Sequence, residues 1–222
     1  IYGQPYDPRL FKLCRDKGIY LIEDAAQAHG ASQVMLDGNE LVAGSMGDLG
    51  CFSFFPSKNM AVGGEGGMLT TTVDELTDGV SLVVNHGRSP SLESMQLGSN
   101  LRMSEVSAAI GTVQLSHLDS WVGRRREIAE IYHQAFADHP LISTPKVRPG
   151  AKHAWHQYCL STEYPDELVA HLDQHGIDAR RYYVTPCHRQ NVFTKHPQHE
   201  QVLPVTATLS STLVAIPVMH EL

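Results

Sequence analysis

Short apolar segments alternate with amphipathic segments along the first half of the sequence, and this alternation is the feature that most limits the fold. Residues 7–18 have the pattern of a helix that begins after Asp7, carries a proline at its first position and ends at Gly18. The apolar run 19–22 is too short for a helix, so we predict a strand buried on both faces of a parallel sheet. This order of elements predicts an α/β fold.

The same reasoning extends the prediction along the rest of the chain. Further strands are predicted at residues 49–54, 67–72 and 155–160, and further helices at residues 74–84, 104–118, 121–137 and 166–175. The inward face of the helix 104–118 is predicted to consist of Val106, Ala109, Ile110, Val113 and Leu118. The last part of the sequence is predicted to be looped, because it carries Pro186, Pro197, Pro204 and Pro217.

Composition and charge argue against two classes of function. A length of 222 residues with 42% hydrophobic and 18% charged residues is typical of a soluble globular protein. The net charge of −7 argues against nucleic-acid binding, and the one basic run, Arg124–Arg126, is interpreted as a solvated helix face. No apolar stretch is long enough to span a bilayer and the first residues lack a targeting pattern, so we expect a cytoplasmic protein without membrane contact.

The cysteines and histidines do not follow the spacing of a metal site. The four cysteines lie far apart without a Cys-x-x-Cys pair, which is typical of reduced thiols. The 13 histidines include the group His153, His156, His188, His196 and His199. Because zinc ligands usually occur at tighter and more regular offsets, no metal is predicted.

A lysine and an aspartate carry the clearest chemistry. Asp24 follows the predicted strand 19–22, and ligands of open α/β sheets bind beyond the carboxyl ends of strands. Lys58 lies in a predicted loop beside Ser57 and ahead of the glycine-dense residues 63–67. An amine that can form a Schiff base and an acid that can keep a pyridine nitrogen protonated are groups that hold pyridoxal phosphate. The residues alone leave open that Asp24 caps a helix, that Lys58 is a surface charge and that the glycines are a flexible connector.

Eight short motifs occur in the order and spacing of one known family. They are Tyr2–Pro5, Glu23–Ala31, Gly47–Asp48, Phe52–Phe54, Pro56–Asn59, Gly64–Gly67, Asn85–Gly87 and Asn100–Met103. With these motifs the sequence resembles the DegT/DnrJ/EryC1/StrS sugar aminotransferases over nearly all of its length. The resemblance implies a fold-type-I transferase that depends on pyridoxal phosphate and forms a homodimer with a shared active site. It also implies transfer of an amino group, usually from glutamate, to a keto group of a nucleotide-linked sugar in amino-sugar or polysaccharide biosynthesis.

The resemblance implies a role for each matching polar residue. Lys58 is expected to bond covalently to the cofactor and to move a proton during the transfer. Asp24 is expected to pair with the pyridine nitrogen, and Gln27 to lie near the phenolic oxygen. Ser53 is expected to bind the phosphate, and Asn100 to reach the phosphate of the cofactor in the partner subunit.

Two further residues are candidates for substrate binding. Arg102 matches the last motif, and both a substrate contact and a structural ion pair are open for it. The segment Pro186–Gln190 resembles a part of the family's small domain near the substrate entrance. His188 is therefore the second candidate.

The resemblance also assigns the parts of the chain. Residues 1–118 are expected to be the C-terminal part of a large mixed-sheet domain that binds the cofactor. Residues 119–222 are expected to be a small α+β domain that begins with a long linking helix. The sequence opens at Ile1 without a methionine, and it lacks the phosphate-binding turn and the ring-stacking aromatic residue of the family. We therefore expect an N-terminally incomplete chain.

Two alternatives to an aminotransferase stay open. The first is a sugar dehydratase of the same family, although relatives with that chemistry tend to replace the lysine with histidine, so Lys58 favours amino transfer. The second is a truncated remnant that folds or binds a partner without catalysis.

Overall fold

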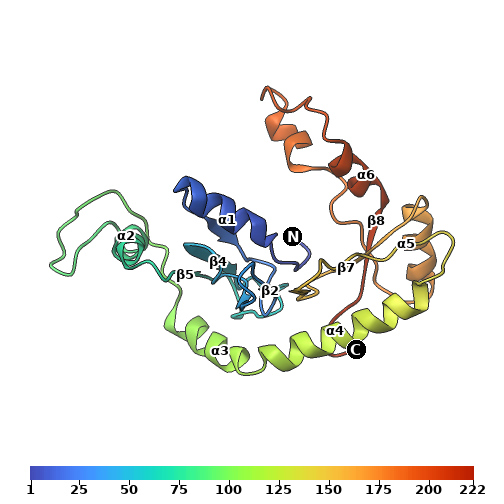
Figure 1. Ribbon diagram of the computed structural model, residues 1–222, viewed down its shortest axis with the longest axis horizontal. Helices are drawn as coiled ribbons and strands as arrows, with labels where there is room; N and C mark the ends of the chain where they lie inside the picture. The colour runs from blue at the N-terminus through green and yellow to red at the C-terminus, as the bar shows by residue number, and fades with distance from the viewer. The chain divides into compact units, whose positions relative to one another are not determined.

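The computed structural model describes all residues 1–222, and the chain divides into two compact units. The larger unit consists of residues 1–124 and 147–156, and the smaller unit consists of residues 125–146 and 157–222. Figure 1 shows the order of the helices and strands along the chain. The expected assignment of residues 1–118 and 119–222 to two family domains stays a prediction.

Helix α1 (Pro8–Lys17) has the ends that its sequence predicts. The carboxylate of Asp7 accepts a hydrogen bond of 2.9 Å from the backbone amide of Arg9, which caps the first turn. At the other end Gly18 adopts the left-handed conformation with φ of 62°, which suits glycine. The side chain of Phe11 packs on a buried cluster that includes Ala25 and Ala28. In Figure 1 this helix lies beside the strands of the larger unit.

The main sheet of the larger unit has the strand order β1-β4-β5, from β1 (Ile22–Asp24), β4 (Leu49–Ser53) and β5 (Gly67–Thr70). Strands β1 and β4 are parallel, whereas β4 and β5 are antiparallel. The predicted strand 19–22 is wrong in its position and its burial. Ile19, Tyr20 and Ile22 are exposed, Ile22 by 61%. The buried side chain of β1 is that of the polar Glu23.

A second sheet contains β2 (Ser32–Val34), β3 (Glu40–Val42) and β6 (Ala151–Lys152) in the order β3-β2-β6. All of its pairings are antiparallel. The sequence prediction missed these strands, although Asp37-Gly38 is a hairpin signal and Gly38 adopts φ of 88°. Strand β6 joins the hairpin from a distant part of the sequence, which no local pattern indicates.

Three helices follow β5: α2 (Asp74–Val84), α3 (Glu105–Leu115) and α4 (Leu118–Phe136). The hydroxyl of Ser104 caps α3 by accepting a hydrogen bond of 3.1 Å from the amide of Ser107. The predicted inward face is wrong except at Leu118, since Val106, Ala109, Ile110 and Val113 are exposed. The buried residue of α3 is Gly111, which lies against Val62 and Met60. Because Leu118 begins a new helix, it does not share a face with the apolar residues of α3.

The basic run on α4 is not a solvated face. Arg125 is only 7% exposed, and it follows the helical spacing of the buried residues Val122, Ile128 and Ala129. Burial lowers the pKa of Arg125, and the charge of Glu221 opposes this effect. The helical period therefore decides the burial of this arginine, although the sequence prediction weighed only its charge.

The smaller unit contains a pair of antiparallel strands, β7 (Tyr158–Ser161) and β8 (Leu213–Ile216). Its helices are α5 (Pro165–Gln174) and α6 (Pro204–Thr212), with the short 3₁₀ turns η1 (Cys187–Arg189) and η2 (Asn191–Phe193). The prediction of a looped C-terminal part is wrong for residues 204–216, because every residue of β8 is buried. A proline at the first position of a helix, as in α6, is a recognised signal that the prediction did not use.

None of the helices combines the length and the apolar character that crossing a membrane requires. Among residues 1–222, no three His, Cys, Asp or Glu side chains are grouped so that they could hold a metal ion.

Candidate active site

The carboxyl ends of β1 and β4 lie at the same edge of the main sheet because the two strands are parallel. Asp24 is the last residue of β1 and Ser53 is the last residue of β4. One carboxylate oxygen of Asp24 accepts a hydrogen bond of 3.1 Å from the amide of Ala26. Residues 25–30 form turns, so Asp24 caps a turn and not a helix. Its carboxylate is exposed at the place where ligands of such sheets bind.

Lys58 lies in a loop that its own backbone closes. The amide of Phe54 donates to the carbonyl of Gly66 at 2.8 Å, and the amide of Val62 donates to the carbonyl of Phe54 at 3.2 Å. Within this loop the amide of Lys58 donates to the carbonyl of Phe55 at 2.9 Å. The predicted loop is thus a closed turn with a partly buried lysine.

The pKa of Lys58 depends on its burial and on the charge of Asp24. Burial lowers the pKa of the Lys58 amine, and Asp24 is near enough for its negative charge to oppose that effect. A lysine with a lowered pKa has a larger neutral fraction and is a better nucleophile. The two residues that the sequence prediction singled out therefore interact electrostatically, and their roles toward a cofactor stay predictions.

Two other predicted residues lie at or just after the ends of these strands. Gln27 is partly buried in the turn that follows Asp24. The hydroxyl of Ser53 is 3.4 Å from the amide of Phe55, so it contacts the start of the Lys58 loop. Their expected contacts with a cofactor stay predictions.

Two of the glycines that follow Lys58, Gly66 and Gly67, are closely packed and do not behave as a flexible connector. A β-carbon at Gly66 would lie 2.6 Å from the side chain of Val62 and 2.9 Å from the sulfur of Met103. A β-carbon at Gly67 would lie 2.8 Å from the carbonyl oxygen of Phe52. All three distances are shorter than a β-carbon normally allows, so the close approach of these segments favours glycine.

Asn100 and Arg102 occur together on the exposed segment between α2 and α3. The Nε of Arg102 donates a hydrogen bond of 3.2 Å to the Oδ1 of Asn100, and the backbone of Asn100 pairs with that of Asn85. The structural partner of Arg102 is thus an amide and not an acid. The expected roles of Asn100 toward a partner subunit and of Arg102 toward substrate stay predictions.

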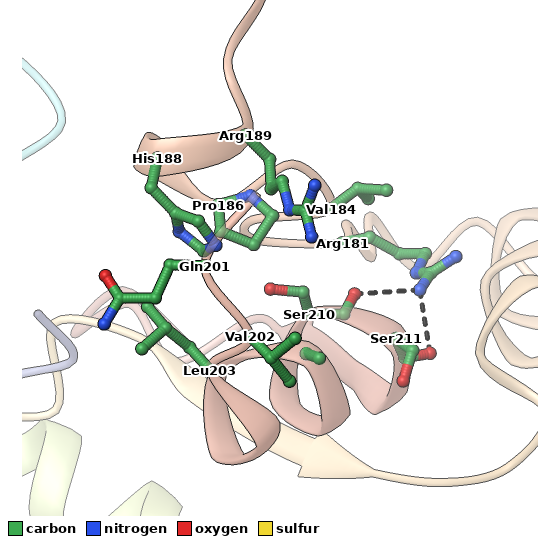
Figure 2. Close-up of a pocket in the computed structure, with 11 residues that line it drawn as sticks. Arg181, Val184, Pro186, His188, Arg189, Gln201, Val202, Leu203, Ser210 and Ser211 are labelled. Atoms are coloured by element: carbon green, nitrogen blue, oxygen red, sulfur yellow. Dashed lines mark hydrogen bonds between the residues drawn. The ribbon is translucent and has the colours of Figure 1, made fainter. Parts of the chain in front are cut away.

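His188 lies in the smaller unit, where it lines a cavity of about 340 Å³. Figure 2 shows His188 and Arg189 of η1 on one side of this cavity and Ser210 and Ser211 of α6 on another. Arg181 donates to the backbone carbonyls of both serines, at 3.1 and 2.8 Å. The two arginines are each paired with an acid of the same unit, Arg181 with Asp166 and Arg189 with Glu200. The substrate role of His188 stays a prediction.

Sequence reasoning missed the structural role of Glu23. This side chain is 5% exposed, and its carboxylate accepts hydrogen bonds from the amides of Gly44, Met46 and Gly47 at 2.9, 2.6 and 2.7 Å. Strand alternation is the signal that could have found it, because neighbouring residues of β1 point to opposite faces. Asp24 therefore faces outward when Glu23 faces inward.

His29 is a second buried group that the sequence prediction did not use. Its imidazole is 2% exposed, and its ring lies 5.3 Å from that of Phe52 and 5.9 Å from that of Phe54. Neither ring nitrogen has a hydrogen-bond partner. Burial and, to a smaller extent, the charge of Lys58 lower the pKa of His29 to about 4, whereas the backbone of Ser53 opposes the shift. The imidazole is therefore neutral at physiological pH.

We expect His29 to make the larger unit less stable in acid. The folded protein binds fewer protons than the unfolded chain between the ordinary pKa of 6.5 and the folded pKa of about 4. The contribution of neutral His29 to the free energy of unfolding is therefore fully present above pH 6.5. It decreases by roughly 3 kcal/mol as the pH falls toward 4. Urea unfolding between pH 4.5 and 7.5 measures this slope. His29→Phe should flatten it, and an equal slope in both proteins would contradict the expectation.

Comparisons with known proteins place this site in a family context. A profile of the DegT/DnrJ/EryC1/StrS aminotransferase family matches residues 1–222. A dTDP-3-amino-3,4,6-trideoxy-alpha-D-glucose transaminase of Streptomyces venezuelae is 34% identical over 98% of the chain and 56% of its own length. A UDP-N-acetyl-3-dehydro-alpha-D-glucosamine 3-aminotransferase of Acidithiobacillus ferrooxidans is 34% identical over 100% of the chain and 58% of its own length.

Solved structures show the same likeness. The chain is similar to DesV of S. venezuelae, with a TM-score of 0.92 and 33% identity over 100% of the chain and 59% of DesV. It is also similar to a DegT/DnrJ/EryC1/StrS aminotransferase from Brucella abortus, with a TM-score of 0.89 and 30% identity over 99% of the chain and 58% of that protein. The fold is therefore part of a fold-type-I aminotransferase fold, which confirms the predicted fold class. The chain spans a little under 60% of the length of these relatives.

Proposed function

Because the chain belongs to the DegT/DnrJ/EryC1/StrS aminotransferase family, we propose that it carries the lysine-bearing part of a pyridoxal-phosphate-dependent aminotransferase site. The family depends on pyridoxal phosphate and acts on nucleotide sugars. The proposed acceptor is a keto group of a nucleotide-linked sugar, and the proposed amino donor is an amino acid, glutamate. The product would be an amino sugar for polysaccharide or secondary-metabolite biosynthesis.

The observation that carries this proposal is the electrostatic interaction of Lys58 with Asp24, which ends β1 at the carboxyl edge of the main sheet. When bound, the cofactor supplies an aldehyde that condenses with amines and a ring that withdraws electrons while its nitrogen is protonated. An amine of lowered pKa beside an exposed carboxylate fits both ends of such a group. Lys58 would hold the aldehyde, Asp24 the ring nitrogen, Gln27 the phenolic oxygen and Ser53 part of the phosphate.

The chain's own residues supply proton movement and orientation. Burial of the Lys58 amine favours its neutral form, which can accept a proton and return it. The closed backbone of the loop places Lys58 shortly after β4, whose carboxyl end lies at the same edge of the sheet as the end of β1. The tight glycine packing at Gly66 and Gly67 holds the loop against the strand that precedes it.

Addition of pyridoxal phosphate to the purified protein tests the proposal. We expect a visible absorbance band that borohydride fixes and that peptide mapping assigns to Lys58, while the exposed Lys12 and Lys17 remain unlabelled. Glutamate should then convert the bound cofactor to its amine form. Absence of a band, or a label spread evenly over the surface lysines, would contradict the proposal and support a non-catalytic remnant.

The same sample separates amino transfer from dehydration. A 4-keto or 3-keto nucleotide sugar should gain nitrogen in the presence of the glutamate-treated protein, as mass spectrometry of the sugar would show. Elimination of water from a deoxy-sugar nucleotide without nitrogen gain would indicate a sugar dehydratase instead.

We propose in addition a homodimer with a shared active site, in which Asn100 reaches the cofactor of the partner subunit. The support is an exposed apolar surface on and before α3, which includes Leu97, Leu101, Val106 and Val113. Light scattering should give a mass of twice the chain mass of 24.5 kDa. A monomer at micromolar concentration would contradict this arrangement.

A further inference from the structure

The residue that follows Lys58 is almost completely buried. The side chain of Asn59 is 3% exposed and faces residues 153–156, which belong to the same unit. Its Nδ2 donates a hydrogen bond of 2.9 Å to the carbonyl of Ala154. Its Oδ1 lies 3.3 Å from the Nδ1 of His156, which donates when that nitrogen carries the proton. Both ends of the buried amide are therefore in use.

The segment that receives Asn59 is itself firmly held. The amide of Ala154 donates to the carbonyl of Gly3 at 2.9 Å, and Ala154 is fully buried. The amide of Trp155 donates to the Nδ1 of His153 at 2.8 Å, and the two rings stack at 3.9 Å. Trp155 also adopts a φ of 47°, which a bulky residue adopts only when its surroundings impose it. The acceptor of Asn59 is thus a fixed anchor.

The Lys58 loop lacks such an anchor in its own backbone. Its internal hydrogen bonds join Phe54 to Gly66 and to Val62, and Lys58 to Phe55, which closes the loop on itself but does not tie its tip to another segment. At its far end the amide of Ala61 donates to the Oε1 of Gln114 at 2.9 Å. Asn59 is the residue that ties the tip itself, one position from the lysine, to an external segment.

We propose that Asn59 is a positioning residue that sets the direction and the burial of the Lys58 amine through its two hydrogen bonds to residues 154 and 156. Without them the tip of the loop can turn outward, and the amine becomes solvated like that of an ordinary surface lysine. The catalytic meaning of this role rests on the proposed function, whereas the orientation of the amine does not.

Competitive acetylation of the cofactor-free protein at a series of pH values tests the proposal. Mass spectrometry gives the pH midpoint of labelling for Lys58 and for Lys12, an exposed lysine on α1 that serves as the internal standard. In Asn59→Ala we expect the Lys58 midpoint to rise toward that of Lys12. A rise of half a pH unit lowers labelling of Lys58 at neutral pH about threefold. His156→Phe, which removes only one of the two bonds, should give a smaller rise in the same direction.

The matched control is Gln114→Ala, which removes a side-chain bond to the same loop at Ala61. It should destabilise the protein without moving the Lys58 midpoint. Equal shifts in the Asn59 and Gln114 variants, or an unchanged midpoint in both Asn59→Ala and His156→Phe, would show a merely structural amide and overturn the proposal. If Asn59→Ala fails to fold, His156→Phe against Gln114→Ala decides. Because no cofactor is present, failure of the proposed function leaves this result unaffected.

Discussion

Replacing Lys58 with alanine is expected to abolish the borohydride-stable label and to slow amino transfer by roughly 10²- to 10⁴-fold or more. The reason is that one side chain is proposed both to form the covalent bond and to move the proton. Single-turnover measurement with glutamate, followed by the absorbance of the bound cofactor, gives the rate of the chemical step.

Two comparisons make this result specific to Lys58. Lys12→Ala changes an exposed lysine paired with Asp16 on α1 and should leave the rate unchanged. Lys58→Arg keeps the positive charge but cannot condense with an aldehyde, so it should be as slow as Lys58→Ala. A Lys58→Ala protein that still turns over at a tenth of the normal rate would exclude Lys58 as the catalytic amine.

The second large effect is on stability and concerns Glu23. Glu23→Ala is expected to lower the free energy of unfolding by about 3 to 5 kcal/mol, because three backbone amides lose a charged acceptor in a buried place. Glu23→Gln should cost less, since its amide oxygen can still accept. Urea unfolding followed by tryptophan fluorescence measures the loss, and both tryptophans, Trp121 and Trp155, lie in the larger unit with Glu23.

The control for Glu23 is Asp78→Ala on the exposed face of α2, which should change the free energy of unfolding by less than about 0.5 kcal/mol. A Glu23→Ala protein as stable as this control would show that the turn 43–47 holds its shape without the carboxylate.

Local signals explain which parts of the fold are predictable from the sequence. The ends of α1 follow from Asp7 and Gly18, and the start of α3 follows from Ser104, because each cap acts within a few residues. The burial of a side chain is harder to predict than a helix end, since it depends on which other segment packs against that side chain. The exposed Val106 and the buried Arg125 both contradict the expectation from residue type, because the surroundings of α3 and α4 decide which side is covered.

The same distinction applies to the candidate site. Asp24 and Lys58 stand out in the sequence because their chemistry is unusual in its setting, and in the structure the charge of Asp24 acts on the Lys58 amine. Glu23 and Asn59 have partners that lie 21 to 97 positions away, so the sequence does not show which groups they bind, although strand alternation could have indicated that Glu23 is buried. The strand β8 is missed for the same reason, since its partner β7 lies more than fifty residues earlier in the chain.

The long reach of Asn59 affects how the protein is made on the ribosome. Its acceptor, the carbonyl of Ala154, lies 95 positions later in the chain. At a synthesis rate of 5 to 20 residues per second, the tip of the lysine loop emerges roughly 5 to 20 seconds before its anchor exists. During translation the Asn59 amide therefore has no partner at first, and the larger unit is complete only after residues 147–156 have been synthesised.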